Sequence, residues 1–328
     1  MTEPSQTKKI KWGIIGLGRI ANSFAKDLAT IPDAELYAVA SRSQEKAGEF
    51  AKKHNAKKAY GSYEALANDK NIDAVYVATP HAMHKDNAIM CLKNGIAVLG
   101  EKPFAMNANE VDEMIAVAKG KNTLLMEALW TYFLPHYQYV LEAIKSNTFG
   151  KVLKLEADFG FSRSYDISTR LFNKDLGGGS LLDIGIYPIF VALSTLGKPK
   201  KIEAKATFFE NGADSTCNMV FQYDNDVEAH LRSSLIEETP TQAIFYCENA
   251  TVKINTKFHE PSTVSIFIDE NEDVIEFSYY TIGYNFETIH FNQLLRDGKT
   301  ESDIMTFQFS EQLIKTLDEV RSLINLQY

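Results

Sequence analysis

Apolar runs and amphipathic segments alternate along roughly the first 125 residues of the chain. Short continuous apolar runs predict buried strands at residues 10–15, 35–40, 74–78 and 96–99. Segments whose apolar residues recur three or four positions apart predict helices at residues 20–28, 44–54, 86–94 and 109–119. This alternation predicts a doubly wound α/β domain over residues 1–125, with a parallel sheet and crossover helices on both faces.

The pattern changes after a helix predicted at residues 135–146. β-rich runs with short polar connections predict strands at residues 151–161, 201–209, 215–223, 227–235, 241–247, 251–255, 263–268 and 274–279. Further helices are predicted from Gly177–Ser180 to residue 196, at 285–296 and at 310–324.

These elements predict a second, α+β domain over residues 126–304, built on a large open, mostly antiparallel sheet. Asp224–Asp226 lies between two of the predicted strands and indicates a hairpin. The last helix, within residues 305–328, carries an apolar stripe made of Leu313, Leu317, Val320 and Ile324. We expect this stripe to pack back on the first domain.

Composition narrows the class of protein. With 45% hydrophobic and 23% charged residues among 328, the chain has the composition of a soluble globular protein of two domains. A net charge of −9 argues against a nucleic-acid partner. No apolar stretch approaches the length needed to span a membrane, and residues 1–9 lack the apolar core of a signal peptide. We therefore expect a cytoplasmic protein.

The three cysteines, Cys91, Cys217 and Cys247, are too widely spaced to indicate a disulfide framework or a metal cluster. Each is expected to be a small buried side chain. The pair His81 and His84 invites a zinc interpretation, but no convincing third ligand accompanies it, so we predict no metal.

The first predicted strand runs directly into a glycine turn and then a helix. Gly16 is expected to make the turn, Gly18 to let phosphates approach the backbone, and Ala21 to keep the helix close to the strand. Backbone N–H groups at a helix N-terminus bind anions, so this context predicts a dinucleotide site. A glycine-containing loop without a ligand is the alternative.

The end of the second predicted strand bears on which nicotinamide cofactor binds. An acidic residue there would contact the ribose 2′-hydroxyl of NAD, but the chain has Ser41, Arg42 and Ser43. A guanidinium fits a 2′-phosphate with charge-assisted bonds, so we predict NADP in preference to NAD. Alternatively, Arg42 is a solvated surface charge.

Two more predicted strands end in loops that carry polar groups. Thr79 and Pro80 follow one strand, and Glu101 and Lys102 follow another. Ligands bind at the carboxyl ends of such strands. Pro103 restricts Lys102 to extended conformations, so its ammonium is expected to project into the cleft and orient a substrate hydroxyl or carbonyl. A surface ion pair between Glu101 and Lys102 is the alternative.

Asp183 and Tyr187 are four residues apart in an apolar helical segment and therefore share one face. We predict Tyr187 as a proton donor and acceptor beside Lys102, with Asp183 orienting the substrate or the tyrosine. In the alternative, both are satisfied core residues. Glu127 and Trp130, at the expected domain junction, either line the cofactor pocket or only pack against it. His84 either contacts the cofactor or caps the next helix.

The segments that carry a family resemblance are Trp12–Ala21, Ala59–Tyr63, Ala78–Pro80 with His84, Glu101–Pro103, and Gly177–Tyr187. In this order they resemble the Gfo/Idh/MocA family over essentially the whole chain. The resemblance implies an N-terminal Rossmann domain and a C-terminal domain whose open sheet commonly builds homodimers or homotetramers. It also implies hydride transfer between a nicotinamide and a sugar, polyol or related carbon.

By this resemblance Lys102 and Tyr187 are the catalytic pair. Many members have histidine where this chain has Tyr187; a tyrosine there resembles members that oxidise trans-dihydrodiols or D-xylose at C1. Tyr132 stands where related sequences often have arginine. The resemblance implies these cofactor-binding residues: Gly16, Leu17, Gly18, Arg19, Ile20, Ser41, Arg42, Ser43, Thr79, Pro80, His81, His84, Glu101, Lys102, Glu127 and Trp130.

The sequence thus predicts an NADP-dependent oxidoreductase of a small sugar, polyol or trans-dihydrodiol. Two alternatives remain open. One is an enzyme that holds its nucleotide tightly and passes hydride between two sugars. The other is a non-catalytic nucleotide-binding regulator, against which the joint presence of Lys102, Asp183 and Tyr187 argues.

Overall fold

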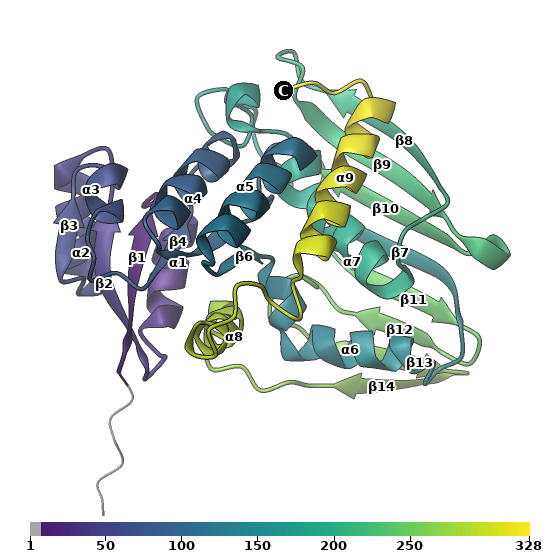
Figure 1. The fold of residues 1–328 in the computed structure, drawn as a ribbon. Helices are drawn as coiled ribbons and strands as arrows, with labels where there is room; N and C mark the ends of the chain where they lie inside the picture. The colour runs from purple at the N-terminus through teal and green to yellow at the C-terminus, as the bar shows by residue number, and fades with distance from the viewer. Residues whose placement is uncertain (1–7) are drawn as a thin grey trace, which may run out of the picture. The chain divides into compact units, whose positions relative to one another are not determined.

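The computed structural model describes residues 8–328, which divide into two compact units (Figure 1). Unit 1 comprises described residues 8–105 together with Asn109–Leu129 and Thr281–Phe307. Unit 2 comprises Met106–Ala108, Trp130–Tyr280 and Gln308–Tyr328. Each unit is described by itself below.

Unit 1 is built on a six-stranded sheet whose order is β3-β2-β1-β4-β5-β6. All neighbouring strands pair in parallel. The strands are β1 (Ile10–Ile15), β2 (Ala34–Ala40), β3 (Lys58–Tyr60), β4 (Ala74–Val77), β5 (Ala97–Glu101) and β6 (Leu125–Ala128). This is the doubly wound order, so the predicted fold of the first domain is confirmed. The short strands β3 and β6 were not predicted.

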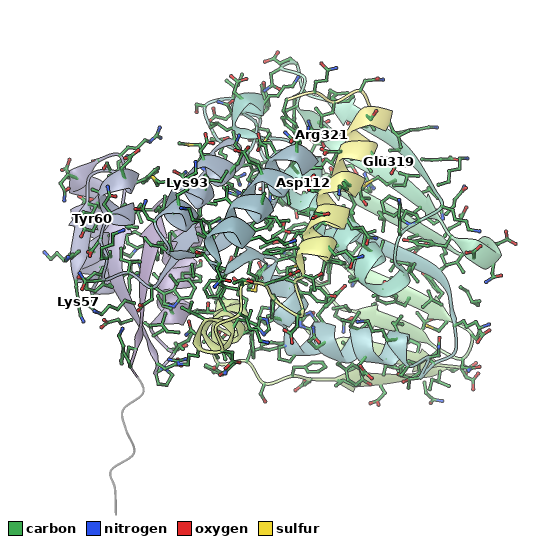
Figure 2. All side chains as sticks on the ribbon, viewed as in Figure 1. Lys57, Tyr60, Lys93, Asp112, Glu319 and Arg321 are labelled. Carbon is green, nitrogen blue, oxygen red and sulfur yellow. The ribbon has the colours of Figure 1, made fainter. Side chains whose placement is uncertain are left out.

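Helical segments connect the successive parallel strands of unit 1, and one further helix comes from the later segment Thr281–Phe307. They are α1 (Arg19–Leu28), α2 (Gln44–His54), α3 (Tyr63–Ala67), the 3₁₀ turn η1 (His81–Met83), α4 (His84–Lys93), α5 (Ala108–Lys121) and α8 (Tyr284–Arg296). Local capping starts two of them, because Ser43 accepts a bond from Lys46 N at 3.3 Å and Ser62 from Ala65 N at 3.1 Å. Tyr60 on β3 is labelled in Figure 2.

Helix α8 belongs to unit 1, whereas the expected boundaries placed residues 281–304 in the second domain. The Asp27 carboxylate of α1 accepts N–H bonds from Gly283 and Tyr284 at 2.9 and 2.8 Å and so caps α8. The indole of Trp12 donates to Asn292 Oδ1 at 3.1 Å. These partners lie more than 250 positions away along the chain, which is why local patterning did not reveal them.

Unit 2 is built on an eight-stranded sheet whose order is β14-β13-β12-β11-β7-β10-β9-β8. Strands β7 and β10 pair in parallel and the other neighbours pair antiparallel, as a mostly antiparallel open sheet requires. The strands are β7 (Val152–Gly160), β8 (Lys201–Phe208), β9 (Asp214–Gln222), β10 (Glu228–Ser234), β11 (Ala243–Cys247), β12 (Thr251–Ile254), β13 (Val264–Ile268) and β14 (Asn271–Ile275).

Two connections in this sheet test the sequence patterns. The predicted hairpin at Asp224–Asp226 is confirmed, because it joins the antiparallel strands β9 and β10. The strand expected at residues 274–279 is wrong in position: β14 ends at Ile275. Asp269, with φ of 51°, makes a tight turn after β13 that places Ile268 opposite Asn271. Strand β14 therefore starts three residues earlier than expected.

Helices lie across one face of the unit 2 sheet, as α6 and α7 show in Figure 1. The helical segments are η2 (Trp130–Phe133), α6 (Pro135–Lys145), η3 (Lys174–Leu176), the π-helical turn η4 (Leu181–Gly185), α7 (Ile186–Leu196), η5 (Asp224–Asp226) and α9 (Phe307–Leu323).

From Gln308 onward α9 groups with unit 2 by its contacts. The expectation that it packs on the first domain stays a prediction. The ring of Phe309 lies 5.4 Å from that of Tyr132 and 6.0 Å from that of Phe190. The apolar stripe expected on this helix is buried. Tyr132, which stands where related sequences often have arginine, therefore packs its ring within unit 2.

One helical stretch among residues 8–328, Lys174–Leu196, is long and apolar enough to cross a membrane by length and composition, with a mean hydropathy of 1.6. The expectation that no apolar stretch approaches this length was therefore wrong. Within the fold 94% of that window is buried, as in a core helix. The three cysteines are free and buried, as predicted.

Candidate active site

The glycine turn of unit 1 has the geometry of a phosphate cradle. Gly16 has φ of +87°, and a Cβ there would lie 2.6 Å from the backbone carbon and oxygen of Ala78. Gly18 precedes α1, and no atom lies within 4 Å of the position its Cβ would take. No side chain caps α1, so its first N–H groups face the open side of Gly18. These residues fit a dinucleotide pyrophosphate.

The end of β2 presents a cation. Arg42 is exposed and lies beside the phenol of Tyr63 on α3. Burial raises the pKa of Tyr63, and the Arg42 guanidinium partly opposes that rise. Ser43 caps α2, and Ser41 Oγ accepts the Ser43 N–H at 3.3 Å. The two serines therefore shape the turn, which leaves the guanidinium as the charged group suited to a 2′-phosphate.

His84 joins the two strand-end loops of unit 1. Its Nε2 lies 2.8 Å from the carbonyl oxygen of Thr79, and its Nδ1 lies 2.8 Å from that of Pro103. Both partners are acceptors, so the ring satisfies both only when each nitrogen carries a proton. The ring does not cap α4, which has no side-chain cap bond. His84 instead fixes the loop after β4 to the loop that holds Lys102.

The loop of Lys102 is held by further bonds. The Lys102–Pro103 peptide is cis, and Phe104 N donates to Glu127 Oε1 at 3.0 Å. The Tyr76 hydroxyl donates to Glu101 Oε1. Glu127, on β6, is therefore a support of this loop. Lys102 itself is half-buried directly after β5.

In unit 2, Tyr187 and Asp183 lie where η4 meets α7. Tyr187 is 5% exposed, and the indole Nε1 of Trp130 donates to its hydroxyl oxygen at 3.1 Å. Asp183 accepts a bond from Arg170 Nη2 at 2.9 Å. Trp130, predicted as a cofactor contact, is thus a partner of the phenol. A donated bond stabilises the negative charge that appears on a phenol oxygen when its proton leaves.

Three glycines let this helical segment pack closely. A Cβ on Gly178 would lie 2.6 Å from the carbonyl oxygen of Arg170, and one on Gly185 would lie 2.9 Å from Ser233 Oγ on β10. A Cβ on Gly179 would lie 2.2 Å from Asp214 Oδ1. Close packing therefore requires glycine at the start of this helical segment. The contact at Gly178 places Arg170 within hydrogen-bond distance of Asp183.

Sequence reasoning missed two residues of this site, Arg170 and His259. The His259 ring lies 5.1 Å from that of Tyr187 and stacks on Phe159 at 4.1 Å. Thr131 Oγ1 donates to the His259 carbonyl at 2.9 Å. Neither residue stands in a motif or a periodic pattern, so no local signal could have found them.

His136 supports the loop that presents His259. Burial lowers the pKa of His136 to about 4, so the ring is neutral at physiological pH. A neutral ring fits its surroundings: Nε2 donates to the Phe258 carbonyl at 2.9 Å and Nδ1 accepts from the Tyr279 hydroxyl at 2.6 Å. Across residues 8–328, no group of three or more His, Cys, Asp or Glu is placed to hold a metal ion.

Comparisons with known proteins follow the same division of the chain. Residues 10–129 match the oxidoreductase family with an NAD-binding Rossmann fold, and residues 137–253 match the GFO/IDH/MocA C-terminal domain. The trans-1,2-dihydrobenzene-1,2-diol dehydrogenase of Xenopus tropicalis is 37% identical, covering 97% of this chain and 99% of the relative. The NADP⁺-dependent scyllo-inositol 2-dehydrogenase of Bacillus subtilis (strain 168) is 35% identical, covering 97% and 98%.

Solved structures share the fold. A 3-ketoreductase from Actinomadura kijaniata in complex with NADP and TDP-benzene matches with a TM-score of 0.88 at 24% identity, covering 97% of this chain and 98% of that chain. The aldose-aldose oxidoreductase of Caulobacter crescentus complexed with glycerol matches with a TM-score of 0.89 at 19% identity, with the same coverage.

Proposed function

Because the chain belongs to the Gfo/Idh/MocA family of oxidoreductases, we propose that Lys102 and Tyr187 are the proton-transfer pair of an NADP-dependent dehydrogenase. The enzyme acts on a hydroxyl or dihydrodiol group of a small sugar, polyol or dihydrodiol. The observation that carries the proposal is the buried Tyr187 phenol, whose oxygen accepts the Trp130 indole N–H. A donor on the phenol oxygen stabilises the phenolate that forms when the proton leaves.

In the oxidative direction, Tyr187 takes the proton of the substrate hydroxyl. The Lys102 ammonium stabilises the phenolate, and Asp183, held by Arg170, orients the substrate or the tyrosine. When bound, NADP supplies the hydride acceptor for oxidation and the donor for reduction. The residues of this chain supply position and charge.

The experiment that tests this assignment replaces each member of the pair. Tyr187→Phe and Lys102→Met should each lower turnover by about a hundredfold or more, since general acid–base catalysis contributes about 10²–10⁴-fold. NADPH binding, followed by fluorescence, should stay near that of the wild type. Tyr223→Phe, which also removes a buried hydroxyl of unit 2, is the control. Wild-type turnover in either pair variant would overturn the assignment.

We assign the preference for NADP to Arg42. Charge reversal in Arg42→Asp should weaken NADPH binding far more than NADH binding, because only NADPH carries the 2′-phosphate. Equal losses for both cofactors would refute the role of Arg42.

The substrate that we propose is an aldose oxidised at C1 or a trans-dihydrodiol. The support is the tyrosine at position 187 and the identity with dihydrodiol dehydrogenases. A panel of aldoses, polyols and dihydrodiols, assayed by NADPH absorbance, tests it. Retention of nucleotide through dialysis would favour an enzyme that passes hydride between two sugars instead.

We also propose that the enzyme is a cytoplasmic homodimer or homotetramer that assembles through the sheet of unit 2. The support is a face of this sheet that alternates charge across its strands, with Glu156 opposite His230 and Asp158 opposite Arg232. A shallow depression of about 490 Å³ lies over the same strands. Light scattering measures the mass, and a monomer at micromolar concentration would contradict this part of the proposal.

A further inference from the structure

A buried carboxylate anchors the start of the helical segment that carries Asp183 and Tyr187. Asp214, the first residue of β9, is fully buried. Its Oδ2 accepts a bond from Ser180 Oγ at 2.6 Å and one from Leu181 N at 2.7 Å. Leu181 is the first residue of η4. Asp214 therefore caps η4, which carries Asp183 and leads directly into α7, where Tyr187 lies.

The other oxygen of this carboxylate has no hydrogen-bond partner, and neither has the buried hydroxyl of Tyr328. Both atoms border the same glycine: the Cβ position of Gly179 lies 2.2 Å from Asp214 Oδ1 and 3.2 Å from Tyr328 Oη. A buried acceptor and a buried donor, each without a partner, thus lie against one residue. Leaving both unpaired is costly, and one hydrogen bond satisfies both.

The surroundings of Tyr328 fix its ring and keep its hydroxyl protonated, so that the hydroxyl can donate a hydrogen bond. The guanidinium of Arg321, labelled on α9 in Figure 2, lies 4.9 Å above its ring. Arg321 is fixed by the Asp318 carboxylate at 3.0 Å and by the Met106 carbonyl at 2.6 Å. Burial raises the pKa of Tyr328, the Asp214 carboxylate raises it further, and Arg321 lowers it in part. The hydroxyl keeps its proton at neutral pH.

We propose that Tyr328 donates its hydroxyl proton to Oδ1 of Asp214, and that the two residues are a positioning pair that fixes η4 and thereby Asp183 and Tyr187. The inference rests on the proposed function for its catalytic consequence and on contacts within unit 2 for its structural part. The phenol then gives Oδ1 a donor, beside the two bonds that Oδ2 accepts from the helix start.

The charge state of Asp214 is sensitive to this third donor. Burial raises the pKa of Asp214 to about 6, while Ser180 and the backbone N–H of Leu181 lower it in part. The titratable groups that face the pair are Cys217 and Asp183, and Arg321 is the cation on Tyr328. Loss of a donor to the ionised form raises the pKa of a carboxyl group. Removing the Tyr328 hydroxyl should therefore raise the pKa of Asp214.

The first test measures the anchor without using activity. Tyr328→Phe keeps the ring and its contact with Arg321 but removes the donor. We expect amide hydrogen exchange of residues 181–185 to become about tenfold faster, because the cap of η4 is weakened. Tyr223→Phe is the matched control, since its hydroxyl is also buried in unit 2 without a partner. Unchanged exchange in Tyr328→Phe, or an equal change in Tyr223→Phe, overturns the proposal.

The second test measures the catalytic consequence in the whole enzyme. Tyr328→Phe should lower kcat about tenfold while leaving the Kd of NADPH unchanged, because a small misplacement of Tyr187 costs rate rather than cofactor affinity. The acid limb of the kcat profile should move to higher pH. In an Asp214→Asn background, Tyr328→Phe should have no further effect on kcat or on the acid limb.

The outcomes separate the two proposals. Faster exchange in a protein that oxidises no substrate would leave the anchor standing and overturn the proposed function. In an active enzyme, any one of three results would overturn the positioning pair. These are unchanged hydrogen exchange in Tyr328→Phe, an acid limb of its kcat profile that does not move, or fully additive effects of Tyr328→Phe and Asp214→Asn on kcat. If Asp214→Asn does not fold, the difference in hydrogen exchange between Tyr328→Phe and Tyr223→Phe still tests the positioning pair.

Discussion

In unit 1, close contact between backbone segments fixes the positions of the loops at the strand ends. In unit 2, hydrogen bonds from buried side chains fix the helical segment η4–α7. At the end of β1, the backbone of Gly16 lies against that of Ala78, and one ring, His84, spans two carbonyl groups. In unit 2, Tyr187 and Leu181 are fixed by side chains 57 and 33 positions away. Parallel strands bring their ends together by topology alone. A helix across a sheet face can slide, so specific polar bonds must fix it.

Buried carboxyl groups show the same contrast. Glu287 in unit 1 is fully buried, and neither of its oxygens has a hydrogen-bond partner. Burial raises its pKa well above the usual value, and the carboxylates of Glu101 and Asp27 add to the rise. Asp214 in unit 2 is equally buried, but its donors hold its pKa at about 6. At neutral pH the first acid is therefore protonated and the second is ionised.

The largest effect is expected from adding one methyl group at the glycine turn of unit 1, which tests whether backbone contact fixes this turn. Gly16→Ala should lower NADPH affinity more than a hundredfold and destabilise the fold by about 4 kcal/mol, since a Cβ at positive φ would overlap backbone atoms that cannot move. Calorimetric binding and thermal unfolding measure the two effects.

Gly18→Ala is the control for this prediction. Space around Gly18 is open and its φ is −83°, so stability should change by less than about 0.5 kcal/mol while NADPH affinity falls. Equal destabilisation by both substitutions would show that backbone approach does not set this turn.

In unit 2 the equivalent substitution is Gly179→Ala. Its Cβ would overlap the Asp214 carboxylate at a φ of +128°, so we expect a loss of about 3 kcal/mol together with a lower kcat. Gly197→Ala is the matched control, because Gly197 also has positive φ but open space. A kcat unaffected by Gly179→Ala would separate Asp214 from the site.

Replacing the two buried acids by amides tests the second contrast through its pH dependence. The folded protein holds the Asp214 proton more tightly than the unfolded chain does, so this group lowers the free energy of unfolding as pH rises from about 4 to about 6 and adds no slope above that. Asp214→Asn should remove this slope, about 3 kcal/mol for a shift of roughly two units. Denaturant unfolding at several pH values measures it.

Glu287→Gln should raise stability at pH 7, because the native side chain is neutral there whereas the glutamate of the unfolded chain ionises above its usual pKa of 4.5. The pKa shift has the same sign as that of Asp214 but extends to higher pH, so the variant should gain on the wild type from about pH 4.5 upward and go on gaining above neutrality. A large loss at pH 7 would indicate an ionised Glu287.

The local hydrophobic pattern was sufficient to predict those parts of the fold in which strands and helices alternate regularly. The parallel, doubly wound sheet of unit 1, the mostly antiparallel sheet of unit 2 and the family were predicted and are confirmed. The short strands β3 and β6 were missed because each includes a charged residue, Lys58 or Glu127, and so shows no continuous apolar run, unlike the equally short β4. The placement of α8 was missed because its partners, Asp27 and Trp12, are distant in sequence.

In the candidate site, residues that a local turn requires could be predicted from the sequence. Residues that contact the site from distant parts of the chain could not. Gly16 and Gly18 were interpretable because a turn between a strand and a helix needs them. Arg170 and His259 became visible only when the fold brought them to Asp183 and Tyr187. The joint action of Lys102 and Tyr187 stays a prediction.

The sequence by itself determined the two sheets and the glycine turn, because hydrophobic periodicity and positive φ act over a few residues. Only the tertiary structure decided which charges became buried and which polar groups found partners. Asp214 illustrates the reason: its pKa, its bond to Leu181 and its neighbour Tyr328 all depend on residues far away in the chain. Burial and hydrogen bonding are properties of the assembled fold, and no local pattern encodes them.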